Sequence, residues 1–208
     1  MMKRLPLTLV CASAAAAVLA GCASPEPRYY TLAQGPGAVA APAPATAPST
    51  DTLWLEVAPV RVPERLNRPQ LVVRDGRNGN DSGSDAGVRL LDLSRWSSPL
   101  PDELRDALSQ RLQATLGAVD TYQQGLSDVQ PLYRITTEVL RLDADVGQRA
   151  GATINWTVRR LPDGKVVSGR TQAELSAPGA VDGVVAAYRE IVASTANDIA
   201  AGVQALRR

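Results

Sequence analysis

The first 22 residues constrain what this chain can fold into more than any other part of its sequence. Lys3 and Arg4 give a short positive start, and residues 5–19 are almost wholly apolar and carry no charge. This apolar run is too short to cross a bilayer comfortably, and the small residues that follow it favour cleavage. We therefore expect residues 1–21 to be a signal peptide and the folded part of the chain to be secreted.

The cysteine at position 22 determines where the secreted chain is held. Leu-Ala-Gly-Cys at 19–22 resembles the lipobox of bacterial lipoproteins, whereas an ordinary secretory signal with an incidental cysteine is the alternative. Each buried methylene of an acyl chain contributes about 0.8 kcal/mol, so several chains anchor a protein firmly. Ala23 and Ser24 include no aspartate, which resembles the pattern of lipoproteins sent to the outer membrane. We expect lipid attachment at Cys22, on the outer membrane and facing the periplasm.

The composition of the chain removes most classes of enzyme. The 22 basic and 21 acidic residues nearly balance, and no basic patch stands out, so nucleic acid is not an expected partner. Cys11 leaves with the signal and Cys22 is acylated, so no thiol remains for a disulfide. The chain has no histidine, which excludes Cys–His and Ser–His pairs and the usual zinc sites. We expect neither an enzyme nor a cofactor.

Composition also divides the chain into three parts. After the signal peptide at 1–21, residues 22–52 form a lipidated segment, with strand-forming residues at 29–32 and repeated Ala-Pro at 34–50. An Ala-Pro segment of this kind is a semi-rigid tether that extends by about 3.1 Å per residue. Residues 53–208 are the expected domain.

Periodicity within this domain predicts strands and two long helices. The expected strands lie at 53–62, 70–74, 88–93, 132–144, 149–160 and 166–175. A Gly/Asn/Asp/Ser-rich loop at 75–87 and a tight turn at 162–165 separate neighbouring strands. Apolar residues at helical spacing predict amphipathic helices at 100–116, capped by Ser97 or Ser98, and at 183–206, capped by Asp182. This order predicts an α+β domain, a mostly antiparallel sheet with the two long amphipathic helices packed on one face.

Three local features allow both a functional and a structural explanation. The loop at 75–85 has the oxygen donors that calcium prefers, but it lacks the EF-hand spacing, and a hairpin connection explains it better. The scattered carboxylates, and Lys165 in its tight turn, are better explained as surface charge than as acid–base or Ser–Lys chemistry. Arg95 and Trp96, before the first helix, fit packing at the helix entrance or an anchor for a partner.

Three motifs make the chain similar to a known family. They are Tyr-Tyr-Thr-Leu at 29–32, Val-Pro-Glu-Arg-Leu-Asn-Arg-Pro-Gln-Leu-Val at 62–72 with Arg74, and Arg95-Trp96 through Pro99-Leu100. Together they resemble the ABC-type transport auxiliary lipoproteins, also called the PqiC type, over essentially all of the mature chain. The sequence departs from the family pattern at Arg65, where an aromatic residue is common, and at Asn67, where an acid is common. The Ala-Pro tether and the glycine-rich loop look like insertions.

The resemblance implies a non-enzymatic role in an MCE/ABC-type intermembrane lipid transport system that supports envelope integrity. The implied partners are the outer membrane, through the anchor, and the MCE-domain protein of the system, with phospholipid and a second copy of the chain as further candidates. Arg65, Arg68, Arg95 and Trp96 are the candidate partner interface. The alternative function is a tethered lipoprotein that activates a cell-wall synthase, because the Ala-Pro segment suits a reach through peptidoglycan.

The strand-forming residues at 29–32 give a further expectation about the domain. We expect them to dock on its sheet with the rings of Tyr29 and Tyr30 buried, leaving 34–50 as an excursion. Each buried ring contributes roughly 1.5–3 kcal/mol, which with ladder hydrogen bonds offsets an ordering entropy of about 1–2 kcal/mol per residue. The alternative leaves 23–50 without contact with the domain.

Overall fold

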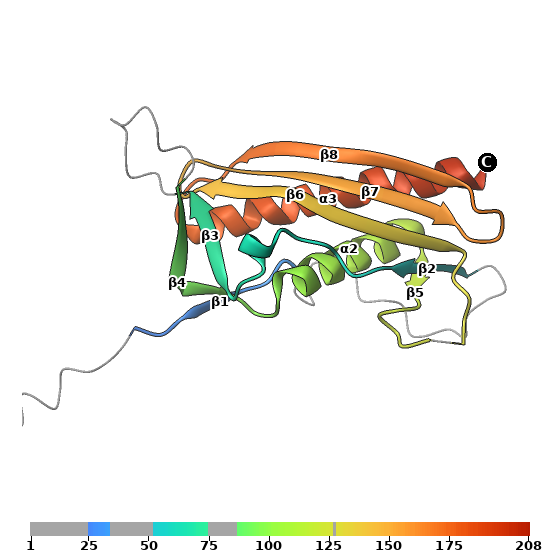
Figure 1. The fold of residues 1–208 in the computed structure, drawn as a ribbon, viewed down its shortest axis with the longest axis horizontal. Helices are drawn as coiled ribbons and strands as arrows, with labels where there is room; N and C mark the ends of the chain where they lie inside the picture. The colour runs from blue at the N-terminus through green and yellow to red at the C-terminus, as the bar shows by residue number, and fades with distance from the viewer. Residues whose placement is uncertain (1–24, 34–51, 75–86, 127) are drawn as a thin grey trace, which may run out of the picture.

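The computed structural model of the protein describes residues 25–33, 52–74, 87–126 and 128–208. The predicted signal peptide, Cys22, the tether at 34–50 and most of the loop at 75–87 lie outside these residues. The described part forms two sheets and two long helices around one buried core (Figure 1). No helix in this part is long and apolar enough to cross a membrane.

The larger sheet has five strands in the order β5-β2-β6-β7-β8. Its β6 (Tyr133–Asp145), β7 (Arg149–Arg160) and β8 (Val166–Ser176) pair antiparallel in succession. β2 (Leu53–Val57) pairs in parallel with both β6 and β5 (Ala118–Asp120). The predicted turn between β7 and β8 is confirmed, because its glycine, at 164, adopts a φ of +70° that a residue without a Cβ reaches without strain.

The smaller sheet has three strands in the order β1-β4-β3. β3 (Gln70–Arg74) pairs antiparallel with β4 (Val88–Trp96), and β1 (Arg28–Tyr30) pairs in parallel with the end of β4. A single 3-10 turn, η1 (Glu64–Leu66), precedes β3. Figure 1 shows this sheet at one end of the elongated molecule, far from the carboxyl terminus.

The two long helices, α2 (Leu100–Leu116) and α3 (Val181–Arg207), lie on the same face of the larger sheet. α3 packs along β6, β7 and β8, whereas α2 packs against β2 and β5, and the helices contact each other. The apolar residues predicted for both helices are buried, apart from the half-buried Leu116. Burying each Leu or Ile side chain contributes roughly 1.5–3 kcal/mol, so this contact is the main source of stability.

The α+β class with two long helices is confirmed, but the strands are arranged differently from the prediction. The sequence predicts one mostly antiparallel sheet, whereas the structure has two mixed sheets in which three of six strand pairings are parallel. The strand predicted for 53–62 ends at Val57, because Pro59 has no N–H to donate to a neighbouring strand. Beyond Pro59, Arg61 forms an isolated parallel bridge with Glu138 of β6. β5 is too short to give a periodic signal.

Neither predicted helix cap is present. α2 begins after Pro99, which makes no side-chain cap hydrogen bond, and the hydroxyls of Ser97 and Ser98 bind Glu103 instead. α3 begins earlier than predicted, so Asp182 lies inside its first turn. The N-cap residues are Pro99 and Ala180, which have no polar side chain, so a rule based on capping side chains could not identify either helix start.

The segment at 29–32 docks on the domain, as the sequence predicts. β1 pairs with residues 94–96 of β4, and Tyr30 and Leu32 are buried in the core. The prediction is wrong for the ring of Tyr29, since this residue is 65% exposed. Neighbouring residues of a strand point to opposite faces, so only one of two adjacent tyrosines can face the core. β1 therefore belongs to the smaller sheet although it precedes the predicted domain start at residue 53.

Candidate functional site

The three sequence motifs that carry the family resemblance meet beside the smaller sheet. The backbone N–H of Trp96 donates to the carbonyl oxygen of Pro69 at 2.8 Å, which joins the third motif to the second. The N–H of Ser97 donates to the carbonyl oxygen of Tyr30, also at 2.8 Å, which joins the third motif to the first. We take the region where they meet as the candidate functional site.

Glu103, in the first turn of α2, binds the segment that follows β1. Its Oε2 accepts hydrogen bonds of 2.7 Å from Thr31 Oγ1 and from the backbone N–H of Leu32. Its Oε1 accepts hydrogen bonds from Ser97 Oγ at 2.5 Å and from Ser98 Oγ at 2.8 Å. Because Glu103 is buried, these donors replace the water that an ionised carboxylate loses on burial.

The same donors keep Glu103 charged. Burial by itself would raise the pKa of this carboxyl, because it disfavours the ionised form. The hydrogen bonds from Ser97, Thr31, Leu32 and Ser98 outweigh burial and hold the pKa below its ordinary value of 4.5. Glu103 is therefore ionised at neutral pH, near the positive end of the α2 dipole.

Arg189, on α3, holds the same segment from the other side. Its Nε and Nη2 donate to the carbonyl oxygen of Thr31 at 3.1 and 2.7 Å. Arg28 also forms an ion pair of 3.3 Å with Asp182, but both side chains are exposed, so the pair adds little. α2, α3 and β4 thus all bind residues 28–32, which fixes the point where the chain enters the domain.

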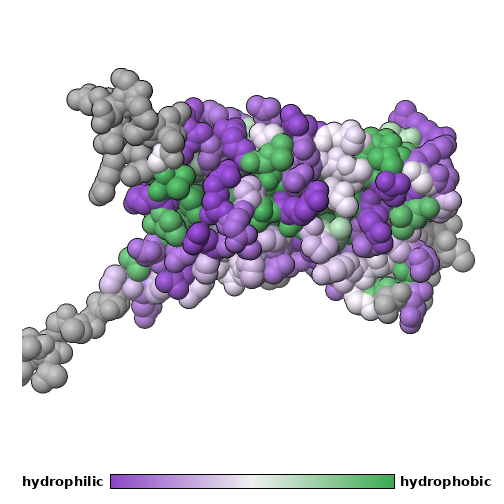
Figure 2. Space-filling model, viewed as in Figure 1, coloured by the Kyte–Doolittle hydropathy of each residue, from purple (hydrophilic) through white to green (hydrophobic). Residues whose placement is uncertain are grey.

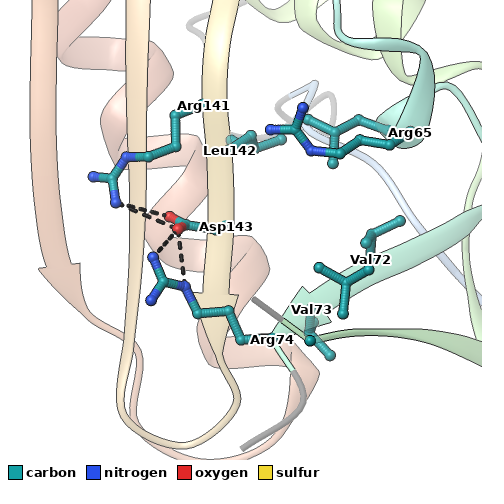
Figure 3. A pocket seen from close by; sticks show the side chains of 10 residues that line it. Arg65, Val72, Val73, Arg74, Arg141, Leu142 and Asp143 are labelled. Carbon is teal, nitrogen blue, oxygen red and sulfur yellow. Dashed lines mark hydrogen bonds and ion pairs between the residues drawn. The ribbon is translucent and has the colours of Figure 1, made fainter. Parts of the chain in front are cut away.

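A small pocket lies between η1, β3 and β6 (Figure 3). Its volume is about 130 Å³, and its lining includes Arg65, Arg74 and Arg141 beside apolar side chains such as Leu142. Arg74 Nε donates to Asp143 Oδ2 at 2.9 Å, and Arg141 Nη1 lies 3.2 Å from Asp143 Oδ1. Two of the three guanidinium groups are thus paired, and the volume is well below the roughly 300 Å³ of the smaller ligand pockets. The pocket suits a small anionic group rather than a whole lipid.

The structure places the four residues of the predicted partner interface in different surroundings. Arg65 and Arg68 are exposed, in and just after η1. Arg95 is half-buried on β4, where its Nε donates to a backbone oxygen of the same strand at 3.1 Å. Trp96 is buried in the core, with its ring centroid 6.5 Å from that of Tyr188. The packing explanation therefore fits Trp96, and the three arginines lie at the surface.

A second buried polar cluster joins α2, β2 and β5. Arg105 Nη2 and Ser109 Oγ both donate to Asp120 Oδ2 at 2.6 Å, and the N–H of Val57 donates to Asp120 Oδ1 at 3.2 Å. Arg105 Nε donates to the carbonyl oxygen of Val57 at 3.1 Å, and its guanidinium lies 4.3 Å from the ring centroid of Tyr122. Because each charge has partners inside the protein, this cluster stabilises the fold and leaves no group free for chemistry. No three His, Cys, Asp or Glu side chains among the described residues are grouped to hold a metal ion.

The sequence patterns did not single out Glu103 and Arg105. Glu103 looks like an ordinary acid at the start of a helix. The angular position of the two residues on the helix is the signal that sets them apart. At 100° per residue, Arg105 falls within the apolar stripe that includes Leu104 and Leu112, and Glu103 falls at its border beside Ala107. A charge on an apolar face predicts a buried, paired group, because unpaired Glu and Arg are almost never buried.

Comparison with known proteins assigns the chain to a family. The family model described as the ABC-type transport auxiliary lipoprotein component matches residues 30–200. The chain belongs to this family. The match spans both sheets and most of α3 of this auxiliary lipoprotein. No curated relative matches the sequence.

Solved structures share the fold of this auxiliary lipoprotein. An uncharacterized protein is 18% identical with a TM-score of 0.63, and the match covers 86% of this chain and 99% of that one. Protein XCC0632 from Xanthomonas campestris is 17% identical with a TM-score of 0.53, covering 76% of this chain and 87% of that one. At these identities the likeness shows the fold alone.

Proposed function

We propose that this auxiliary lipoprotein is the non-enzymatic outer-membrane component of an MCE/ABC-type intermembrane lipid transport system that supports envelope integrity. The observation that carries the proposal is the attachment of β1. Glu103 and Arg189 hold residues 28–32 on the domain, and only residues 23–27 separate them from the cysteine that we expect to be acylated. The six steps from Cys22 to Arg28 span at most about 20 Å, so the domain stays beside the membrane surface.

The chemistry of the chain supports a binding role. It has no histidine and, once acylated, no thiol, and its buried charges bind groups within the protein. Proteins of this kind act by holding partners in place, and a component that joins a transport system to a membrane needs an anchor and a contact surface rather than reactive groups.

The docked β1 also weakens the alternative of a cell-wall synthase activator. That alternative requires the Ala-Pro segment at 34–50 to act as a spacer between the lipid anchor and the domain. β1 precedes the segment and β2 follows it, and both strands belong to the folded part. The segment therefore does not lengthen the path from Cys22 to the domain, and we favour the transport role.

The proposed contact with the MCE-domain protein uses the arginines of the candidate interface. Arg65 and Arg68 are exposed, and neither forms an ion pair with another described residue. Arg95 pairs with Gln70, which follows Arg68 by two residues, and Trp96 supports this region from the core. Guanidinium groups recognise carboxylates and phosphates through paired hydrogen bonds, so the contacting surface of the partner carries acidic groups.

Cross-linking in the native host tests the proposed function. A photo-reactive residue at position 65 or 68 of the full-length lipoprotein is expected to capture the MCE-domain protein, identified by mass spectrometry. The double variant Arg65→Glu and Arg68→Glu is expected to lose co-purification of this partner, because acidic side chains repel an acidic surface. Arg159→Glu, at an exposed position of β7, is the matched control and retains it. Capture of a cell-wall synthase instead would contradict the transport role.

A further inference from the structure

Exposed apolar side chains gather on β1 and β4. Of the seven large apolar residues exposed in the described part of the chain, Tyr29 lies on β1 and Val88, Leu90 and Leu93 lie on β4. The four are 65%, 54%, 39% and 45% exposed and lie on two paired strands, and we call them the patch. Figure 2 shows hydrophobic residues at the end of the molecule that carries the smaller sheet.

Strand pairing indicates that the residues of the patch point away from the core on the smaller sheet. A register shift between Leu91 and Arg95 interrupts the alternation along β4, and Leu93, two residues before Arg95, shares the side of Arg95. Tyr30 pairs with Trp96 and both are buried, so the preceding pair, Tyr29 and Arg95, faces away from the core. In the same way, Leu71 and Val73 of β3 are buried. Val72 and Arg74 alternate with these two residues along β3 and so point away from the core. Their cross-strand partners, Leu90 and Val88, face outward with them.

The position of the patch in the chain points to what covers it. Six residue steps separate Arg28 from Cys22, a distance of at most about 20 Å, while β4 spans about 30 Å with its nine residues. Once Cys22 is acylated, its Cα is fixed at the bilayer surface. The short connection therefore keeps Tyr29 and the adjoining end of β4 close to that surface.

The side chains of the patch also suit a bilayer surface. Tyrosine has an apolar ring and a polar tip, and it is enriched where membrane meets water. Leucine and valine gain free energy on entering the acyl boundary.

We propose that Tyr29, Val88, Leu90 and Leu93 form a membrane-docking face that lies on the phospholipid surface holding the lipidated Cys22. This inference rests on the acylation that the proposed function includes. Docking adds a second, weaker attachment to the acyl anchor and sets the orientation of the domain. The long sheet and the far ends of β7, β8 and α3 then point away from the membrane.

A single-cysteine probe tests the docking face, because the acylated mature chain contains no other thiol. Full-length lipoprotein with Leu93→Cys or Val166→Cys is labelled with an environment-sensitive dye and reconstituted in vesicles of phosphatidylethanolamine and phosphatidylglycerol. The two positions are 45% and 44% exposed, and Val166 lies on β8 in the larger sheet, so it is the matched control. We expect dye emission at position 93 to shift to shorter wavelength and to be quenched by spin-labelled lipid, while position 166 stays as in water.

The outcomes separate this inference from its premise. Flotation of both labelled proteins with the vesicles establishes the lipid anchor. Flotation with equal, water-like emission at positions 93 and 166 would overturn the docking face and leave the anchor and the transport role standing. A shift at position 93 that spin-labelled lipid does not quench would also overturn it, because protein from a second copy of the chain, rather than lipid, then surrounds the dye. Failure to float would remove the anchor itself and the inference with it.

Discussion

The carboxylate of Glu103 accepts a 2.7 Å hydrogen bond from the backbone N–H of Leu32, which lies 71 residues earlier in the chain. This bond forms only when the N-terminal segment has docked beside α2. It links the position of the N-terminal segment to the packing of α2.

Replacement of Glu103 by Gln is expected to release residues 28–32 from the domain. The amide keeps the size of the side chain but loses the charge that strengthens five hydrogen bonds, and bonds to a charged group contribute about 1.5–3 kcal/mol each. Hydrogen exchange of the Leu32 amide is expected to accelerate at least tenfold. Asp102→Asn removes a charge from the same turn at an exposed position and is expected to leave this amide protected.

The pH dependence of this contact follows from the lowered pKa of Glu103. The folded pKa lies below the ordinary value of 4.5, so the carboxylate contributes its full stabilisation above about pH 4.5. The contribution is lost as the pH falls through the folded pKa. We expect protection of the Leu32 amide to be constant from neutral pH down to this range and then to decrease. A decrease of the same size in Glu103→Gln would assign the effect to another group.

Substitution of Arg105 tests the buried cluster. Arg105→Met leaves the carboxylate of Asp120 buried without its cation, which is expected to cost about 3–5 kcal/mol of the free energy of unfolding. Arg134→Met removes an exposed ion pair with Glu56 and is expected to cost less than about 1 kcal/mol. Denaturant unfolding of both variants measures the difference, and equal midpoints would contradict the assigned role of the cluster.

Gly169 is expected to tolerate no side chain. A Cβ at this position would lie 2.3 Å from the ring of Trp156, its cross-strand partner on β7. The indole is confined because it also approaches Gly202 of α3, so it cannot move aside freely. Gly169→Ala is expected to cost about 1–3 kcal/mol, which thermal unfolding detects as a Tm lowered by several degrees, whereas Ser168→Ala on the exposed neighbour changes it little.

The anchor itself is tested by Cys22→Ala. Without the thiol no acyl chain can be attached, and we expect the precursor to keep its signal peptide because lipoprotein processing requires the cysteine. Metabolic labelling with a radioactive fatty acid is expected to mark the unaltered protein only. Equal labelling of the variant would show that another residue carries the lipid.

The main features of the larger sheet and the helices could be predicted because they follow from short-range patterns. The helical spacing of Leu104, Leu108 and Leu112 by itself identifies the buried face of α2. The turn that contains Gly164 fixes the register of β7 with β8, since a tight connection leaves the two strands one way to pair. Each of these features depends on residues within a few positions of one another.

The candidate site, by contrast, was decided by contacts between distant residues. Nothing near Tyr30 in the chain indicates that its strand partner is Trp96, or that the parallel pairing splits the strands into two sheets. In the sequence, Glu103 looks like an ordinary charge at a helix start. Only the structure shows that Thr31 and Leu32 donate hydrogen bonds to it. The sequence by itself determined the α+β class and the apolar faces of the two helices, and it predicts the secretion signal. The tertiary structure alone decided which strands pair and which charges are buried, because both depend on the free energy gained when segments far apart in the chain exclude water together.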